Sequence, residues 1–146
     1  MTSVRSTALS LLGRRDYTAF ELRQRLIDKG HDPGEVDEQI ESLTGDGTLD
    51  DARVAGVHVR VSSQVKGRGR MRIRQELLAR GISKAIVEAQ LSELPAENED
   101  AAIHKFLARK RVPEKLAPEA RNKVFQQLLR KGFTADAISK ALRHRE

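Results

Sequence analysis

A repeat of 51 residues constrains this chain more than any other feature of its sequence. Gly30, Gly81 and Gly132 lie 51 residues apart, each directly after a lysine or arginine and two residues before an Asp, Ser or Thr. A cation in the last turn of a helix, a glycine free to adopt a positive φ and a side chain that can cap the next helix predict a helix, a tight turn and a second helix. We therefore expect three copies of one helical unit.

Apolar residues coincide in all three copies at five positions, with the spacing of a helix stripe. These columns are Leu22/Ile73/Val124, Leu26/Leu77/Leu128, Ile27/Leu78/Leu129, Val36/Val87/Ile138 and Ile40/Leu91/Leu142. We expect all five columns to be buried. A unit of ~50 residues buries little apolar surface alone, so neighbouring units are expected to share packing.

Local signals divide the chain into helices and modules. Thr18 and Glu21 fit a capping box, and Pro33 after an aspartate suits a helix start. The valine-rich segment after Asp51 favours a strand by propensity alone, but its place in the repeat favours a helix. The sequence predicts an all-α fold with nine helices in three tandem three-helix modules, over residues 1–48, 49–95 and 96–146.

Charge is distributed unevenly among these modules. The chain carries a net charge of +6, made of −3 in residues 1–48, +4 in residues 49–95 and +5 in residues 96–146. Seven cations and no acid lie between Ala52 and Gln75, so we expect these cations to lack local counter-charges. A basic surface of this kind favours a polyanion partner for the last two modules. The alternative is that these charges are ordinary solvated faces.

Two groups of cations are the candidate binding residues. One is a glycine-containing basic loop that runs into a basic helix, and the other lies at the end of the seventh helix, where interaction with the helix dipole is an equally good explanation. The residues are Lys66, Arg68, Arg70, Arg72, Arg74, Lys105, Arg109, Lys110 and Arg111. On charge alone they are candidates for contact with a polyanion. Few aromatic residues are available for base stacking, so binding should be sequence-tolerant and salt-sensitive. We also expect replacement of Arg68, Arg70 and Arg72 to affect folding little.

No pattern of catalytic or metal-binding residues is present in the sequence. The chain has no cysteine, its four histidines are isolated, and it contains neither a GxxxxGK[ST] nor a GxGxxG motif. We therefore predict a protein that is not an enzyme and has no metal site and no cofactor. No run of about 18 apolar residues could span a membrane, and the N-terminal segment does not fit a secretion signal. A cytoplasmic protein is expected.

Spaced motifs along nearly the whole chain resemble the RecX regulatory proteins of bacteria. The residues that carry the resemblance are Arg14-Arg15-Asp16-Tyr17-Thr18, Glu21-Leu22, Leu26, Lys29-Gly30-His31, Leu49-Asp50-Asp51-Ala52-Arg53, Lys66-Gly67, Ile73, Glu76-Leu77, Gly81-Ile82 and Leu128-Leu129-Arg130-Lys131-Gly132-Phe133. The family usually has Phe at the position of Val54 and an aromatic residue at that of Thr48. The first difference should reduce core packing in the fourth helix.

The resemblance implies an elongated, curved array of modules and a modulator of the RecA recombinase. Members of the family lie in the groove of the RecA filament on single-stranded DNA, and they impede filament growth, ATP hydrolysis, strand exchange and the SOS response. The resemblance thus implies RecA filaments and single-stranded DNA as partners, in recombination and DNA repair, and we expect a monomer. With these partners, we predict that the nine cations face DNA phosphates while the first module mainly contacts protein.

Two other functions fit the residues without the resemblance. Paired helices joined by a glycine turn also occur in helix-turn-helix transcriptional regulators that bind duplex DNA. A protein-interaction scaffold with no DNA contact is the third possibility.

Overall fold

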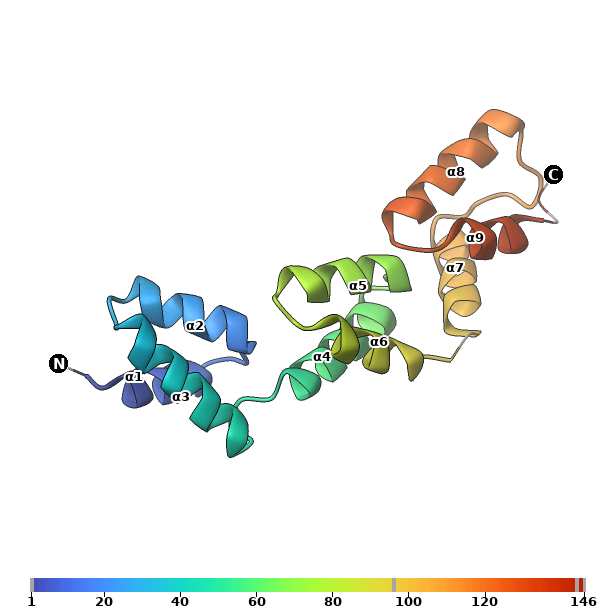
Figure 1. The fold of residues 1–146 in the computed structure, drawn as a ribbon. Coiled ribbons are helices and arrows are strands. Elements are labelled where there is room, and N and C mark those ends of the chain that lie inside the picture. The colour runs from blue at the N-terminus through green and yellow to red at the C-terminus, as the bar shows by residue number, and fades with distance from the viewer. Residues whose placement is uncertain (1, 96, 144, 146) are drawn as a thin grey trace.

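The computed structural model describes residues 2–95, 97–143 and 145. Within these residues the chain is all helical, without strands, and forms three successive three-helix modules in an elongated array with the termini at opposite ends (Figure 1). The first module contains α1 (Val4–Leu12), α2 (Ala19–Asp28) and α3 (Pro33–Gly45). The second contains α4 (Asp51–Arg60), the π-helical turn η1 (Val61–Val65), α5 (Arg70–Ala79) and α6 (Lys84–Ser92). The third contains α7 (Glu97–Arg109), α8 (Pro118–Arg130) and α9 (Ala135–Leu142). The predicted all-α fold of three tandem modules is confirmed.

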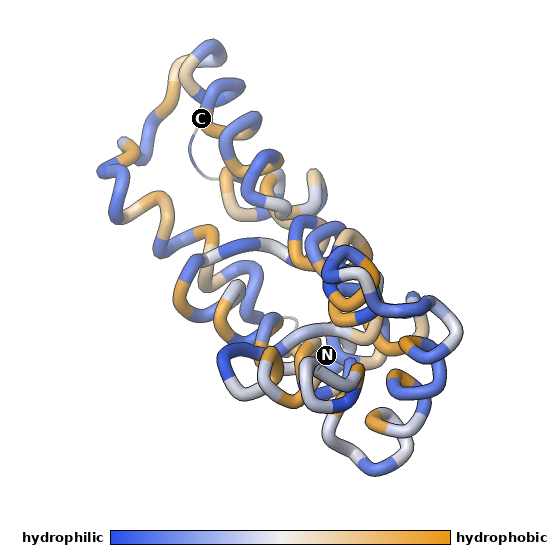
Figure 2. Tube along the Cα trace, turned by 90° about the vertical axis from the view of Figure 1, so that its left-hand side faces the viewer, coloured by the Kyte–Doolittle hydropathy of each residue, from blue (hydrophilic) through white to orange (hydrophobic). Residues whose placement is uncertain are grey.

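Each module has its own hydrophobic core. Leu26, Leu77 and Leu128 occupy the same repeat position and are fully buried in three separate clusters. Val54 belongs to the core of the second module and is only 3% exposed. Hydrophobic and hydrophilic residues alternate along the helices, as expected when one side of each helix faces a small core (Figure 2). No helix of the described part of the chain combines the length and apolarity needed to cross a membrane.

The expected burial holds for most of the repeat columns but not for all. The prediction is wrong for the column of Leu78, because Ile27 and Leu129 are only half-buried and Leu78 is 43% exposed. Each of these residues follows a fully buried leucine and therefore points about 100° around the helix, toward its flank. Ile40 is also half-buried, whereas its two counterparts in the repeat are buried.

Glycine turns join the last two helices of every module in the same way. Gly30, Gly81 and Gly132 have φ values of 96°, 82° and 98°, as predicted. In each turn the glycine N–H donates to the carbonyl three residues before it, and the next N–H donates to the carbonyl five residues before itself. This double closure satisfies the last carbonyls of the helix and requires the left-handed conformation that glycine adopts without strain.

The predicted helix starts are also present. Thr18 and Glu21 form a complete capping box at α2, and Asp32 caps α3 ahead of its proline. The segment after Asp51 is α-helical, as its place in the repeat predicts, but only to Arg60, after which the backbone widens into η1. This π-helical turn leads directly into the basic loop.

Candidate nucleic-acid interface

The first and second modules meet where the start of α2 contacts the turn after α5. The Thr18 hydroxyl donates to the Arg80 carbonyl at 2.7 Å. The Arg80 guanidinium forms a two-pronged ion pair with Glu21, with Nη2 to Oε1 at 2.9 Å and Nε to Oε2 at 3.2 Å. The Ala19 amide donates to Asp51 Oδ1 at 2.9 Å. We call this contact the first junction, and its main charges are paired internally.

Glu21 is held in its charged form at this junction. Burial by itself would raise the pKa of the Glu21 carboxyl group. The hydrogen bonds from Arg80 and from the Thr18 backbone, together with the charges of Arg80 and Arg15, outweigh burial and lower that pKa below its ordinary value. The first junction therefore favours an ionised carboxylate.

The second and third modules meet through the same elements, one repeat further along the chain. At this second junction the Gly69 amide donates to the Lys131 carbonyl at 2.8 Å and the Met71 amide donates to the Gly132 carbonyl at 3.0 Å. The Arg70 amide donates to Glu99 Oε1, on α7, at 2.9 Å. The third module thus caps the start of α5, which has a glycine at the N-cap position and no side-chain cap of its own.

The charges at the second junction differ from those at the first. One repeat after Glu21 and Arg80 the chain has Arg72 and Lys131, two cations in place of an ion pair. Burial lowers the pKa of the Lys131 amine, and the charges of Arg109, Arg72, Lys110 and Arg68 lower it further. Among the described residues, no carboxylate forms an ion pair with Lys131. Lys131 therefore adds a positive charge to this junction that has no ion-pair partner among the described residues.

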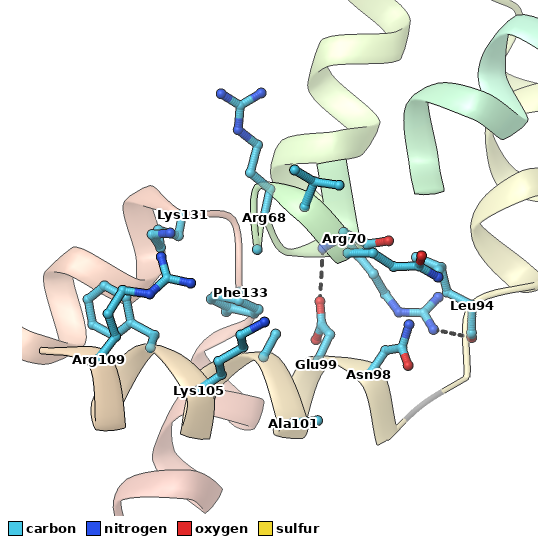
Figure 3. Close-up of a pocket in the computed structure, with 16 residues that line it drawn as sticks. Arg68, Arg70, Leu94, Asn98, Glu99, Ala101, Lys105, Arg109, Lys131 and Phe133 are labelled. Carbon is cyan, nitrogen blue, oxygen red and sulfur yellow. Dashed lines mark hydrogen bonds between the residues drawn. The ribbon is translucent and has the colours of Figure 1, made fainter. Parts of the chain in front are cut away.

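A pocket of about 190 Å³ opens beside this junction, between the basic loop, α7 and the turn after α8 (Figure 3). Lys105 and Arg109 from α7 and Lys131 from the end of α8 line one part of it, together with Phe106. The Lys131 Nζ atom lies 5.4 Å from the centre of the Phe106 ring, a cation–π contact that supports the ammonium group on one side. Glu99 also lines the pocket, with its carboxylate turned toward the Arg70 amide.

Several of the predicted binding residues contact the protein itself. Arg68 pairs with Glu76, Arg72 lies 3.6 Å from the same carboxylate, and Arg74 Nε lies 2.7 Å from Glu88 Oε1. The expectation that the cations between Ala52 and Gln75 lack local counter-charges is wrong for these three, because Glu76 and Glu88 lie beside them in the folded chain.

Arg70 has a structural role that the sequence did not indicate. Its guanidinium donates to the Leu91 carbonyl at 2.8 Å and to the Leu94 carbonyl at 2.5 Å, at the end of α6. These contacts tie α5 to the last turn of α6 and to the segment that follows it. They argue against the expectation that replacement of Arg68, Arg70 and Arg72 would leave folding almost unchanged.

The other predicted residues are more available to a partner. Lys66, Lys105, Arg109, Lys110 and Arg111 form no ion pair with any described residue, and all five are exposed. Arg111 has a φ of 53° in the turn after α7, a conformation that costs a non-glycine residue energy. The pocket brings together four of the nine predicted residues, which are Arg68, Arg70, Lys105 and Arg109.

Lys131 is the pocket residue that the sequence reasoning missed. Its place before a turn glycine was explained by the helix dipole, which gave no reason to connect it with the basic loop. A signal was nevertheless present in the repeat. Glu21 and Arg72 occupy the same column with opposite charges, while Arg80 and Lys131 keep the same sign.

No metal centre is formed by the described residues. Within them, no three His, Asp or Glu side chains gather closely enough to hold a metal ion. His58 contacts Glu76 at 3.1 Å, a carboxylate that also pairs with Arg68 and Arg72, and His104 contacts Asp100 at 3.4 Å.

Comparison with known proteins identifies the family of the chain. Residues 5–43 match the description of the first three-helix domain of RecX, residues 50–91 the second and residues 97–142 the third. The Regulatory protein RecX of Halorhodospira halophila is 38% identical over 146 residues, which cover 95% of this chain and 86% of the relative. The chain belongs to the RecX family. The Regulatory protein RecX of Vibrio vulnificus is 35% identical, over 97% of this chain and 92% of that protein.

Solved RecX structures share the fold. A crystal structure of regulatory protein RecX superposes with a TM-score of 0.85 at 22% identity, over 96% of this chain and 70% of the other. The crystal structure of RecX from Lactobacillus salivarius gives a TM-score of 0.83 at 23% identity, over 96% and 92% of the two chains. The three-module array is therefore the RecX fold.

Proposed function

We propose that this RecX-family chain regulates the RecA recombinase by binding in the groove of the RecA filament on single-stranded DNA. Bound there, it inhibits filament growth, ATP hydrolysis and strand exchange without catalysing a reaction of its own. Membership of a family of regulatory proteins supports the regulatory role. The observation that carries the DNA contact is the accumulation of cations without internal partners at the second junction and at the end of α7.

The division of charge among the modules supports a division of contacts. The first module has a net charge of −3, and its junction charges are paired, so it is suited to contact protein. The exposed cations Lys66, Lys105, Arg109, Lys110 and Arg111 lie in the second and third modules and are suited to phosphates. Arg68, Arg70, Arg72 and Arg74 then act mainly by shaping this surface.

The test is RecA ATP hydrolysis on single-stranded DNA with increasing amounts of the chain. A variant with Lys105, Lys110 and Arg111 replaced by Gln should inhibit less than the wild type. Its salt dependence of binding to single strands should be flatter by about 2 in the log–log slope, since each phosphate contact contributes about 0.7.

A matched control removes the same amount of charge from the first module. Gln replaces Arg14, Arg25 and Lys29, three exposed cations of that module. This control should keep the wild-type salt slope. Equal slopes for the wild type and both variants would contradict the proposed DNA-facing surface.

The chain's binding to duplex DNA separates this proposal from a transcriptional regulator. Gly81 and Gly132 pack directly against residues of the preceding module, so these two glycine turns are parts of junctions. Gel shifts on duplex DNA should therefore be sequence-independent. Strong preference for one duplex sequence would favour a helix-turn-helix regulator instead.

A further inference from the structure

We propose that the pocket at the second junction binds one phosphate group through Lys131, Lys105 and Arg109, as the external counterpart of the carboxylate that Glu21 supplies at the first junction. The ligand is defined by its chemistry, a phosphate diester or a free phosphate ion. The inference that a nucleic-acid backbone supplies this group rests on the proposed function.

The repeat provides the first line of argument. At both junctions the residue before α2 or α5 donates a hydrogen bond to the carbonyl that precedes a turn glycine, through the Thr18 hydroxyl at the first and the Gly69 amide at the second. At the first junction an anion, Glu21, lies against the cation Arg80. At the second, the corresponding anion is replaced by Arg72 while the cation is kept as Lys131. The conserved geometry leaves one cation without its anion.

The surroundings of Lys131 provide the second line. Its amine is partly buried and faces the charges of Arg109, Arg72, Lys110 and Arg68, an arrangement that disfavours the ammonium form. Two of these neighbours are engaged elsewhere, because Arg68 and Arg72 both contact Glu76. An anion in the pocket would relieve the repulsion that remains, and a group with several acceptor oxygens could contact more than one of the cations.

The shape of the pocket provides the third line. Phe106 supports the Lys131 ammonium on one side, and a Cβ atom at Gly67 would lie 3.9 Å from Nζ, so the amine lies close to the basic loop. In Figure 3, Lys105, Arg109 and Lys131 lie along the same part of the pocket. The cations on α7 are exposed, which leaves this part open to a ligand from solvent.

The acid of the pocket lies away from the proposed site. Glu99 precedes Lys105 by six residues and Arg109 by ten on α7, separations of about 9 Å and about 15 Å along the helix axis. One of its oxygens accepts the Arg70 amide, and Arg70 is itself held by carbonyls at the end of α6. Glu99 therefore serves the start of α5 and does not neutralise the cations near Lys131.

The experiment follows the side-chain NMR signal of Lys131 in the full chain with isotope-labelled lysine, assigned with the variant Lys131→Gln. A short oligothymidylate should shift this signal, and the same oligonucleotide with neutral methylphosphonate linkages should not. A shift by inorganic phosphate that competes with the oligonucleotide would show that the same site also takes the free ion. A shift by inorganic phosphate alone would retain the phosphate site and exclude the DNA backbone as its source.

Binding measurements provide the matched control. Lys131→Gln should weaken binding of labelled oligothymidylate about tenfold at low salt, whereas Lys123→Gln, an exposed cation of α8 outside the pocket, should weaken it much less. Circular dichroism checks that both variants are folded. Equal losses for the two variants, or a Lys131 signal that responds to neither anion, would overturn the site. Failure of the wild-type chain to inhibit RecA would instead count against the proposed function, whatever the Lys131 signal shows.

Discussion

The two junctions of this chain each have a hydrogen bond to the carbonyl before a turn glycine, but they differ in how their charges are balanced. At the first, Glu21 and Arg80 pair within the protein, and Thr18 caps its own helix while donating to the neighbouring module. At the second, Arg72 and Lys131 carry like charges, and the third module must cap α5 through its own carbonyls and Glu99. The repeat therefore keeps the position of the contact between modules, while the charges at that contact differ.

This difference suggests that the two junctions have different roles. A junction with a paired, partly buried ion pair is complete without a ligand. A junction that gathers cations loses stability to repulsion, and it regains that stability when an anion binds. We expect the first junction to be mainly structural and the second to gain stability when an anion binds.

The largest loss of stability is expected from substitutions in the hydrophobic cores. These losses should be similar in the second and third modules if the modules differ mainly at their junctions. Leu77→Ala and Leu128→Ala should each reduce the free energy of unfolding by about 2 to 5 kcal/mol, because both side chains are fully buried in equivalent cores. Leu78→Ala is the matched control, since this neighbour is 43% exposed and should cost far less. Urea unfolding followed by circular dichroism measures the three values. A loss below ~0.5 kcal/mol at Leu77 or Leu128, in the range of surface substitutions, would remove that residue from the core.

The turn glycines provide the next comparison. An added Cβ at Gly81 would lie 2.3 Å from Phe20 Cβ, and one at Gly132 would lie 2.5 Å from the Arg72 backbone nitrogen, whereas Gly30 has no atom of another segment within 4 Å. Gly30→Ala should therefore cost only the backbone strain of about 1 kcal/mol. The same change at Gly81 or Gly132 should cost about 1 to 3 kcal/mol more, because the modules must move apart. Thermal unfolding of the three variants measures the order, and equal losses at all three would show that the junctions are not closely packed.

A smaller effect is expected at the ion pair of the first junction. Glu21→Gln should reduce stability by about 1 to 2 kcal/mol, since the pair with Arg80 is charge-assisted but about a quarter of each side chain is exposed. Glu88→Gln, which removes a more exposed acid from its pair with Arg74, is the control and should cost less. Urea unfolding measures both. A larger loss in the control would mean that burial at the junction adds nothing to the pair.

The pH dependence of Glu21 has a defined sign. Because its pKa is lowered in the folded chain, its contribution to stability is present above the unfolded value, near 4.5, and is lost as the pH falls through the folded value. The stability difference between the wild type and Glu21→Gln should therefore shrink below pH 4.5. A difference that grows on acidification would mean that the carboxyl group is protonated more easily in the folded chain than in the unfolded one.

Much of the fold could be read from the sequence because its signals are local and occur three times. The positive-φ glycines, the capping box at Thr18 and the start of α3 at Pro33 each depend on a few adjacent residues. The flank position of Leu78 was misread because the apolar column gave no information about which way its residue points. The end of α4 at Arg60 was also missed, since nothing in the valine-rich segment distinguishes an α-helix from a π-helical turn.

The candidate site was harder to predict because it depends on which charges meet in space. Arg74 and Glu88 lie 14 residues apart and pair only when α5 packs against α6. Arg70 was grouped with the other cations of the basic stretch, but its guanidinium donates to carbonyls at the end of α6. Lys131 lies more than 60 residues from the basic loop, and only the alignment of the repeats relates it to Arg80.

An exchange of charge at the second junction tests the central claim most directly. Arg72→Glu would give this junction the charges of the first, with a carboxylate beside Lys131. Because Arg72 lies 3.6 Å from Glu76, the Arg72 and Lys123 variants are all compared in a Glu76→Gln background, which removes repulsion between the new carboxylate and Glu76. We predict a higher Tm at low salt than for Arg72→Gln, and about tenfold weaker binding to oligothymidylate than for Lys123→Glu, which changes the net charge equally at a distant site. If Arg72→Glu is no more stable than Arg72→Gln and binds single strands as well as Lys123→Glu does, the second junction does not use an external anion, and the account is contradicted.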